Sequence, residues 1–330
     1  MNHKLLASIW ITAALTTAGF AQISNFDSLN GYASGADTRL AFGRAEMLRA
    51  ARLESASNLV FTGDYLDRTV DASQDSIERS GHGQNGRLGY NWQMNDWSFG
   101  AAVGYGDVRS NYKEINSPSP TPLRGNVDAR STMGYVWASY SFSGWRLAAV
   151  GNIGATKNTA RRTSDAGTSL ADFDSSDRAF GLSLSHEYSF SDAMLVTPFV
   201  GLSFASSSAD GFTEQGTAPD RRIVRDFSMD ENRGAIGVRL SGKGATWQPF
   251  ASAAWLARFS GGNSDIFTTA LNGANLSVGR VTAASKGLFY VSTGLSGKLD
   301  EHWNCAGTIE YYSGGNERAL GLALSVVRKF

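Results

Sequence analysis

The last twelve residues of the chain, 319–330, read ALGLALSVVRKF and contain the pattern that decides the fold. Every second side chain is a bulky aliphatic, and the side chains between them are small or polar. The bulky residues are Leu320, Leu322, Leu324 and Val326. Strict alternation is typical of a β-strand whose two faces meet different surroundings. No charge interrupts the bulky face between Leu320 and Val326, so we expect that face to contact lipid.

The same alternation recurs along most of the chain. Together with turn signals it predicts twelve antiparallel strands. They lie near 58–68, 84–94, 97–110, 128–141, 145–158, 175–190, 195–208, 226–241, 246–260, 284–298, 303–313 and 319–330. For 128–141 the sequence does not decide which side chains face outward, because Tyr135 and Trp137 fall on one face and Val136 and Tyr140 on the other.

The face opposite the bulky one is expected to carry small or charged side chains, which suits a wet or plugged lumen. A soluble β-sandwich would instead need one bulky inner face and one charged outer face. The bulky residues in these segments have almost no charged neighbours on their own face. We therefore predict an all-β fold, a twelve-stranded antiparallel transmembrane β-barrel.

The lengths of the connections alternate, which supports the barrel. Short connections are expected near 95–96, 142–144, 191–194, 242–245 and 299–302, and long ones near 69–83, 111–127, 159–174, 209–225 and 261–283. Outer-membrane barrels have short periplasmic turns and longer outer loops. An even number of strands would then put both termini in the periplasm. Five tryptophans lie near predicted strand ends, as in an aromatic girdle: Trp92, Trp97, Trp145, Trp247 and Trp303.

The composition narrows the class of protein. The chain has 330 residues with 30 basic and 30 acidic side chains, so it lacks the basic excess of a nucleic-acid binder. Its single cysteine, Cys305, excludes a disulfide framework and a cysteine-rich metal site. The 37 glycines are expected mainly at lumen-facing positions, where small side chains are needed.

The N-terminal residues indicate export. A positive start at Lys4 precedes an apolar run and then small residues. This is the layout of a secretory signal peptide over 1–21, with cleavage expected between Ala21 and Gln22. An uncleaved membrane anchor is the alternative, but the apolar run is short for a transmembrane helix. The sequence after residue 21 contains no apolar run of the length that a membrane helix needs.

Four segments make the chain from about 36 to 330 resemble the autotransporter β-domain, the translocator of type V secretion. They are 198–202 followed by 210–216, 233–240, 247–250 leading to Trp255, and the last strand ending in Phe330. The resemblance implies a twelve-stranded outer-membrane barrel that gives a polypeptide a passive path through lipid. It also implies export by the Sec translocon and insertion by the barrel-assembly machinery. The expected assembly signal is Phe330 with Val326, Leu324 and Leu322, although Arg328 stands where such signals often carry an aromatic residue.

The resemblance further implies a helix inside the pore, ahead of the first strand. Residues 36–57 are rich in good helix formers and would span about 33 Å as a helix. Their polar residues include Arg39, Glu46, Arg49 and Glu54. Facing them in the lumen, strand parity predicts the charged residues Glu187, Arg233, Arg239 and Glu310. The alternatives are a periplasmic surface helix, or a lumenal charge network with no helix in it.

Almost no passenger precedes this helix. Only residues 22–35 remain between the expected cleavage site and the helix, which is too short to fold alone. Whether any passenger, its own or separately encoded, is exported therefore stays open. Two further functions remain: a diffusion pore, and an adhesin-like protein that binds surfaces through long outer loops.

No enzyme activity, cofactor or metal is expected. The mature chain has three histidines, and His82 is predicted in an outer loop near Asp75 and Glu78. An exposed loop histidine is far commoner than a catalytic one at such a place. His186 is expected to point outward among aromatic residues, and His302 to lie in a short turn. Cys305 alternates with lipid-facing residues, which predicts a small apolar role.

Overall fold

The computed structural model describes residues 58–71, 78–113, 123–165, 167–219, 221–243, 246–261, 263–270, 276–282 and 285–329. The signal peptide, residues 22–35, the helix at 36–57 and Phe330 lie outside these described residues. So do the individual residues Ala21, Gln22, Arg39, Glu46, Arg49 and Glu54. None of the described residues belongs to a helix that is long and apolar enough to cross a membrane.

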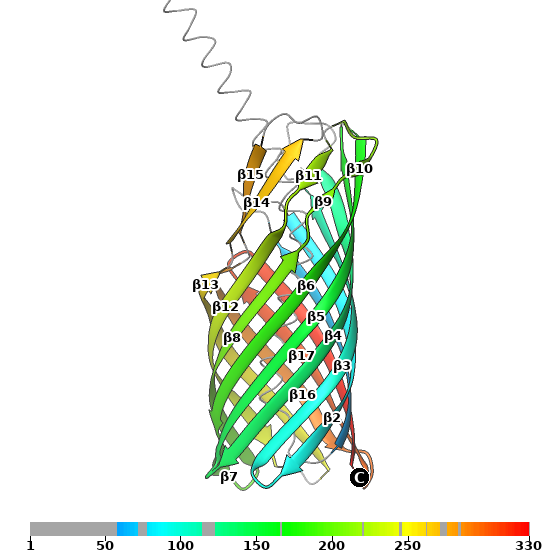
Figure 1. Ribbon diagram of the computed structural model, residues 1–330. Coiled ribbons are helices and arrows are strands. Elements are labelled where there is room, and N and C mark those ends of the chain that lie inside the picture. The colour runs from blue at the N-terminus through cyan, green and yellow to red at the C-terminus, as the bar shows by residue number, and fades with distance from the viewer. Residues whose placement is uncertain are drawn as a thin grey trace, which may run out of the picture.

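Twelve long antiparallel strands form one closed barrel, as the alternation predicted (Figure 1). They are β1 (Asn58–Val70), β2 (Glu78–Met94), β3 (Trp97–Lys113), β4 (Arg124–Phe142), β5 (Trp145–Ser164), β6 (Gly167–His186), β8 (Met194–Ala209), β12 (Phe227–Gly242), β13 (Trp247–Gly261), β16 (Gly287–Lys298), β17 (Trp303–Gly314) and β18 (Glu317–Lys329). The short β7 (Tyr188–Ser191) continues β6.

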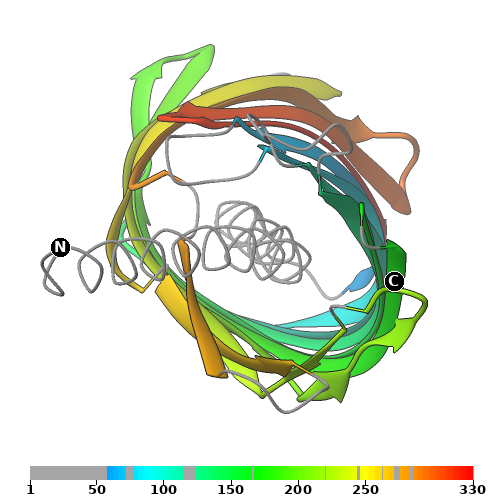
Figure 2. The ribbon, with the colours of Figure 1, turned by 90° about the horizontal axis from the view of Figure 1, so that it is seen from above.

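The barrel closes between its first and last strands. β1 pairs with β18 over its whole length, from Asn58 opposite Lys329 to Val70 opposite Glu317. The view along the barrel axis shows a complete ring of strands around a lumen (Figure 2). Closure leaves no barrel strand with an unpaired edge, which a bilayer without water requires. The ring has a terminus end, where Asn58 and Lys329 lie, and an opposite loop end.

Several strands reach further toward the loop end than predicted, and the long connection predicted at 159–174 is wrong. There β5 and β6 form a hairpin whose pairing runs to Ser164 opposite Gly167. Ala160 and Ala171 are buried inside, whereas Thr159 and Asp172 are exposed outside. A strand that rises beyond the lipid carries polar side chains on its outer face. The loss of apolar residues therefore marks the edge of the membrane and not the end of the strand.

Short strands at the loop end were not predicted. β9 (Phe212–Thr213), β11 (Arg222–Val224), β14 (Asn263–Ala270) and β15 (Leu276–Thr282) form a second sheet of four strands. Figure 1 shows this sheet standing above the ends of β8, β12 and β13. β10 (Gln215–Gly216) pairs instead with the tall β6. The connections 210–226 and 262–286 thus contain folded structure.

The outer face is apolar, but the expectation of a small or charged inner face is wrong in part. Tyr135 is 3% exposed and Trp137 also faces inward, whereas Val136 points outward at 62% exposed. This settles the facing of β4. Trp137 Nε1 donates to Asn91 Oδ1 at 2.8 Å. Further inner aromatic residues are Tyr112, Phe199, Phe250, Tyr290 and Tyr312.

Two populations of glycine explain the glycine content. Inner glycines leave room for the aromatic residues: a Cβ on Gly100 would collide with the indole of Trp137, and one on Gly237 with the ring of Phe199. Gly63 belongs to the second population, with no atom within 4 Å of a Cβ placed on it. It stands opposite Leu324 on the outer face. The expectation that glycine serves mainly the lumen is therefore correct for only part of the set.

Candidate functional site: the barrel lumen

The terminus end of the lumen holds a cavity of about 890 Å³. Among its lining residues are the charged Arg87, Arg146, Glu187 and Arg239. Arg146 Nη2 donates to Ser139 Oγ at 3.3 Å. The guanidinium of Arg239 lies 4.4 Å from the ring centre of Phe250, and its Nε donates to Ser241 Oγ at 3.1 Å. Of the four predicted lumenal charges, the structure brings Glu187 and Arg239 to this one cavity.

The other two predicted charges lie outside that cavity and are completely buried. Glu310 is 0% exposed and accepts hydrogen bonds from the hydroxyls of Tyr290 and Tyr312 at 3.4 and 3.3 Å. Arg233 is also 0% exposed. Its Nε donates to Glu231 Oε1 at 2.6 Å and its Nη2 to the carbonyl of Ser285 at 2.8 Å. Buried charges need such partners because the desolvation cost is several kcal/mol per ion.

The prediction missed further buried charges that the same parity could have found. Asp64 of β1 pairs with Arg87 Nη2 at 3.1 Å. Arg68 pairs with Glu317 at 2.7 Å across the closing seam between β1 and β18. Asp64, Arg68 and Arg87 lie on the inner face of their strands, so alternation extended to charged side chains would have placed them in the lumen.

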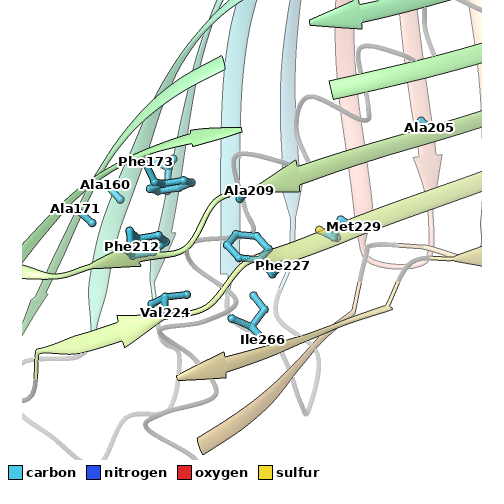
Figure 3. Close-up of a cluster of buried hydrophobic side chains, with 11 residues drawn as sticks. Ala160, Ala171, Phe173, Ala205, Ala209, Phe212, Val224, Phe227, Met229 and Ile266 are labelled. Atoms are coloured by element: carbon cyan, nitrogen blue, oxygen red, sulfur yellow. The ribbon is translucent and has the colours of Figure 1, made fainter. Parts of the chain in front are cut away.

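The loop end of the lumen is lined by an apolar cluster (Figure 3). Inward side chains of β4, β5, β6, β8 and β12 meet Phe212, Val224 and Ile266 from the second sheet. Phe212 stacks on Phe173 with ring centres 4.5 Å apart. Glu214 fixes the same connection to the wall, because Arg162 donates to it from Nε at 3.0 Å and from Nη2 at 2.8 Å. The loop end of the lumen therefore combines an apolar cluster with buried ion pairs, whereas the terminus end has a cavity lined by charged side chains.

The residues of the expected assembly signal lie on the seam strand β18. Leu322 and Leu324 point outward at 46% and 57% exposed, and Val326 belongs to the same outward row. β18 pairs with β17 on one side and with β1 on the other. The described part of this signal is thus the lipid-facing side of the strand that closes the ring.

The described histidines lie in different parts of the chain: His82 in β2, His186 at the end of β6 and His302 between β16 and β17. The loop position predicted for His82 is wrong: it is an exposed residue of β2, opposite Asp67 and Arg109. His82 lies on the polar outer part of β2 near the loop end. The predicted strand began only at residue 84, so this part of β2 was assigned to a loop. His186 lies between the rings of Trp145 and Tyr188, with ring centres 4.6 and 4.2 Å away. The described residues contain no group of three or more His, Cys, Asp or Glu side chains that could hold a metal ion.

A family model for the autotransporter β-domain matches residues 61–310, which is most of the barrel. The chain belongs to the autotransporter β-domain family. It is therefore an outer-membrane barrel of the translocator type, as the sequence motifs indicated. Autotransporter β-domains are translocator barrels rather than enzymes. A search of curated proteins finds no significant match to the sequence.

Solved autotransporter barrels share the fold. The translocator domain of NalP from Neisseria meningitidis superposes with a TM-score of 0.73 at 15% identity, covering 91% of this chain and 97% of NalP's. The β-domain of the Bordetella autotransporter BrkA gives 0.58 at 15% identity, covering 84% and 100%. The transport unit of AIDA-I from Escherichia coli gives 0.51 at 15% identity, covering 87% and 97%.

Proposed function

We propose that this autotransporter β-domain is a passive translocator in which residues 36–57 lie in the lumen once the barrel has assembled. The observation that carries the proposal is the closed ring around a lumen whose wall carries both charged side chains and an apolar cluster. Residues 36–57 offer arginine and glutamate side chains on a helix-forming backbone. Such a helix would match carboxylates and guanidinium groups such as those of Glu187 and Arg239 near the terminus end.

The proposal includes an orientation. Both termini would face the periplasm, with the short turns beside them and the folded connections outside the cell. Export would use the Sec translocon and insertion would use the barrel-assembly machinery. Because the periplasm supplies no ATP, the energy for moving the chain would come from folding of the barrel.

Planar-bilayer conductance tests whether residues 36–57 fill the lumen. The full mature chain should conduct poorly, and deletion of 36–57 should raise the single-channel conductance several-fold because water and ions then enter the lumen. Equal conductance in the two proteins contradicts a helix in the pore and favours a diffusion pore. A variant with residues 22–35 deleted is the matched control, and it should conduct as poorly as the full chain.

A second candidate function is binding of a surface through the loop end. The second sheet exposes Ile223 and Phe267 at 43% and 36%, beside a hollow of about 490 Å³ that both residues line. Exposed apolar residues that line one hollow are a feature of contact sites. Cells that carry Ile223→Ser and Phe267→Ser should then adhere less to matrix-coated plates than cells with the unaltered barrel. Equal adhesion argues against this function.

A further inference from the structure

Three outward cations form no hydrogen bond or ion pair with any described residue. Arg130 lies on β4, Lys157 on β5 and Arg178 on β6, and all three side chains are exposed. These strands are neighbours in the barrel wall (Figure 1). Arg130 and Lys157 stand directly opposite each other in the pairing of β4 with β5. Like charges in directly opposed positions repel, so this arrangement favours an anion between them.

The three cations share one level of the barrel. Arg130 comes twelve residues before Phe142, where β4 ends, and Lys157 twelve residues after Trp145, where β5 begins. Arg178 comes thirteen residues before the end of β7, the continuation of β6. Measured from the turns at the terminus end, the three positions therefore differ in height by at most one residue. Arg109 of β3 lies twelve residues after Trp97 and extends the row to a fourth strand.

That level coincides with a membrane interface. Twelve strand residues at about 3.3 Å each, tilted by about 40°, rise about 30 Å from the turns. The apolar band of an outer-membrane barrel is about 25 Å tall. The side chains just below the row are large and exposed, with Ile153 at 69% and Phe180 at 45%. The row therefore stands where lipid headgroups begin.

Acidic side chains of this wall lie mostly further from the membrane. Asp128 is two residues beyond Arg130 and pairs with Arg109 at 2.5 Å. Asp172 and Asp174 lie further out along β6 than Arg178, and Asp174 stands opposite Lys157 in the pairing of β5 with β6. Asp107, opposite Arg130, is the one acidic residue on the membrane side of the row. Three cations against two carboxylates, Asp107 and Asp174, leave the row with one net positive charge.

We propose that Arg130, Lys157 and Arg178 form a docking row for phosphate-bearing lipid headgroups in the leaflet at the loop end. The lipid-facing surface below the row would hold the acyl chains, and the cations would bind the phosphate from three adjacent strands. Charge complementarity supports this occupant, because each cation near an anionic membrane surface contributes about 1 kcal/mol, or about a fivefold gain in affinity.

Native mass spectrometry of the full chain, folded in detergent, tests the row with two lipids. The unaltered protein should retain dioleoyl phosphatidic acid in preference to dioleoyl phosphatidylcholine. Substituting Arg130→Gln, Lys157→Gln and Arg178→Gln together should abolish that preference. The matched control carries Lys243→Gln, Lys298→Gln and Lys329→Gln, which remove the same charge at the terminus end, and it should keep the preference.

Three results would overturn the proposal: an undiminished preference in the row variant, an equal loss in the control, or displacement of phosphatidic acid by excess inorganic phosphate. The last would mark a site for free phosphate and not for lipid. A heat-modifiable gel shift verifies that each variant is folded. If the triple variant fails to fold, the single variant Lys157→Gln should still lose about fivefold in affinity for phosphatidic acid. Unchanged affinity there counts against the row as well.

Discussion

Glu214 and Arg162 form a buried bidentate ion pair that fastens the connection between β8 and β12 to the barrel wall. Arg162 donates from Nε and Nη2 at 3.0 and 2.8 Å, and both side chains are at most 2% exposed. The backbone N–H of Arg222 donates to the same carboxylate at 2.9 Å. The Glu214 carboxylate therefore joins two parts of the connection, residues 214 and 222, to each other and to Arg162 of the barrel wall.

Replacing Glu214 with glutamine should loosen this connection. The change leaves the Arg162 guanidinium buried without its carboxylate, which costs about 3–5 kcal/mol when a buried pair is broken. Limited proteolysis of the folded barrel should then cut within 210–226 much faster. Asp128→Asn is the control, because its pair with Arg109 is exposed at 36% and 55% and contributes about 1 kcal/mol or less. Similar cutting rates in the two variants would argue against a fastened connection.

Arg68 and Glu317 should stabilise the closing seam. They lie 249 residues apart in sequence and pair at 2.7 Å with both side chains buried. Glu317→Gln should lower the temperature at which the barrel loses its heat-modifiable gel mobility, because one buried charge is left behind. Arg318→Gln breaks the exposed pair with Asp71 at the same rim and should change that temperature little. Equal unfolding temperatures would show that the buried pair adds nothing to the seam.

Two glycines should respond oppositely to enlargement. Gly100→Leu forces the Trp137 indole out of place and breaks its hydrogen bond to Asn91, with an overpacking cost of about 1–3 kcal/mol. Gly63→Leu adds a side chain into open space on the lipid-facing wall and should be neutral. The fraction of each variant that refolds in detergent, measured by gel shift, distinguishes them. Equal refolding would contradict the packing of aromatic side chains over inner glycines.

Adjacent residues of β18 should differ in their tolerance of charge. Leu322 points outward at 46% exposed, and Ala323 lines the inner cavity. Leu322→Arg should cost about 2–4 kcal/mol if the residue lies near the bilayer centre, whereas a lumenal arginine at 323 meets water. Folding yield into lipid vesicles measures the difference. If Ala323→Arg proves the more harmful change, the assignment of the two faces is wrong.

Alternation located all twelve strands because lipid and lumen impose a strict period of two on each membrane segment. It failed where β5 and β6 leave the lipid: Thr159 and Asp172 face water there, so the sequence lost its apolar rows although the strands continue. For the same reason the buried position of Arg162 was not predicted. Its inward direction follows from alternation only if residues 159–164 are assigned to the strand.

The inner face was harder to predict than the outer one. Lipid rejects charge from every outward position, but the lumen accepts glycine, arginine and tryptophan alike. The direction of Trp137 could not be assigned from its own segment. The indole packs over Gly100 of the neighbouring strand, and the sequence of a single strand does not determine its pairing register. Arg233 and Glu310, in contrast, were placed inside by parity alone, and the structure has both fully buried.

Surface exposure of the residues ahead of the barrel tests the translocator account most directly. An epitope inserted between Ser28 and Leu29 should be accessible to antibody on intact cells and should be removed by added protease, since residues 36–57 would lead the chain outward through the lumen. A periplasmic control protein should remain intact in the same cells. An epitope that antibody and protease reach only after the cells are broken would contradict translocation through this barrel.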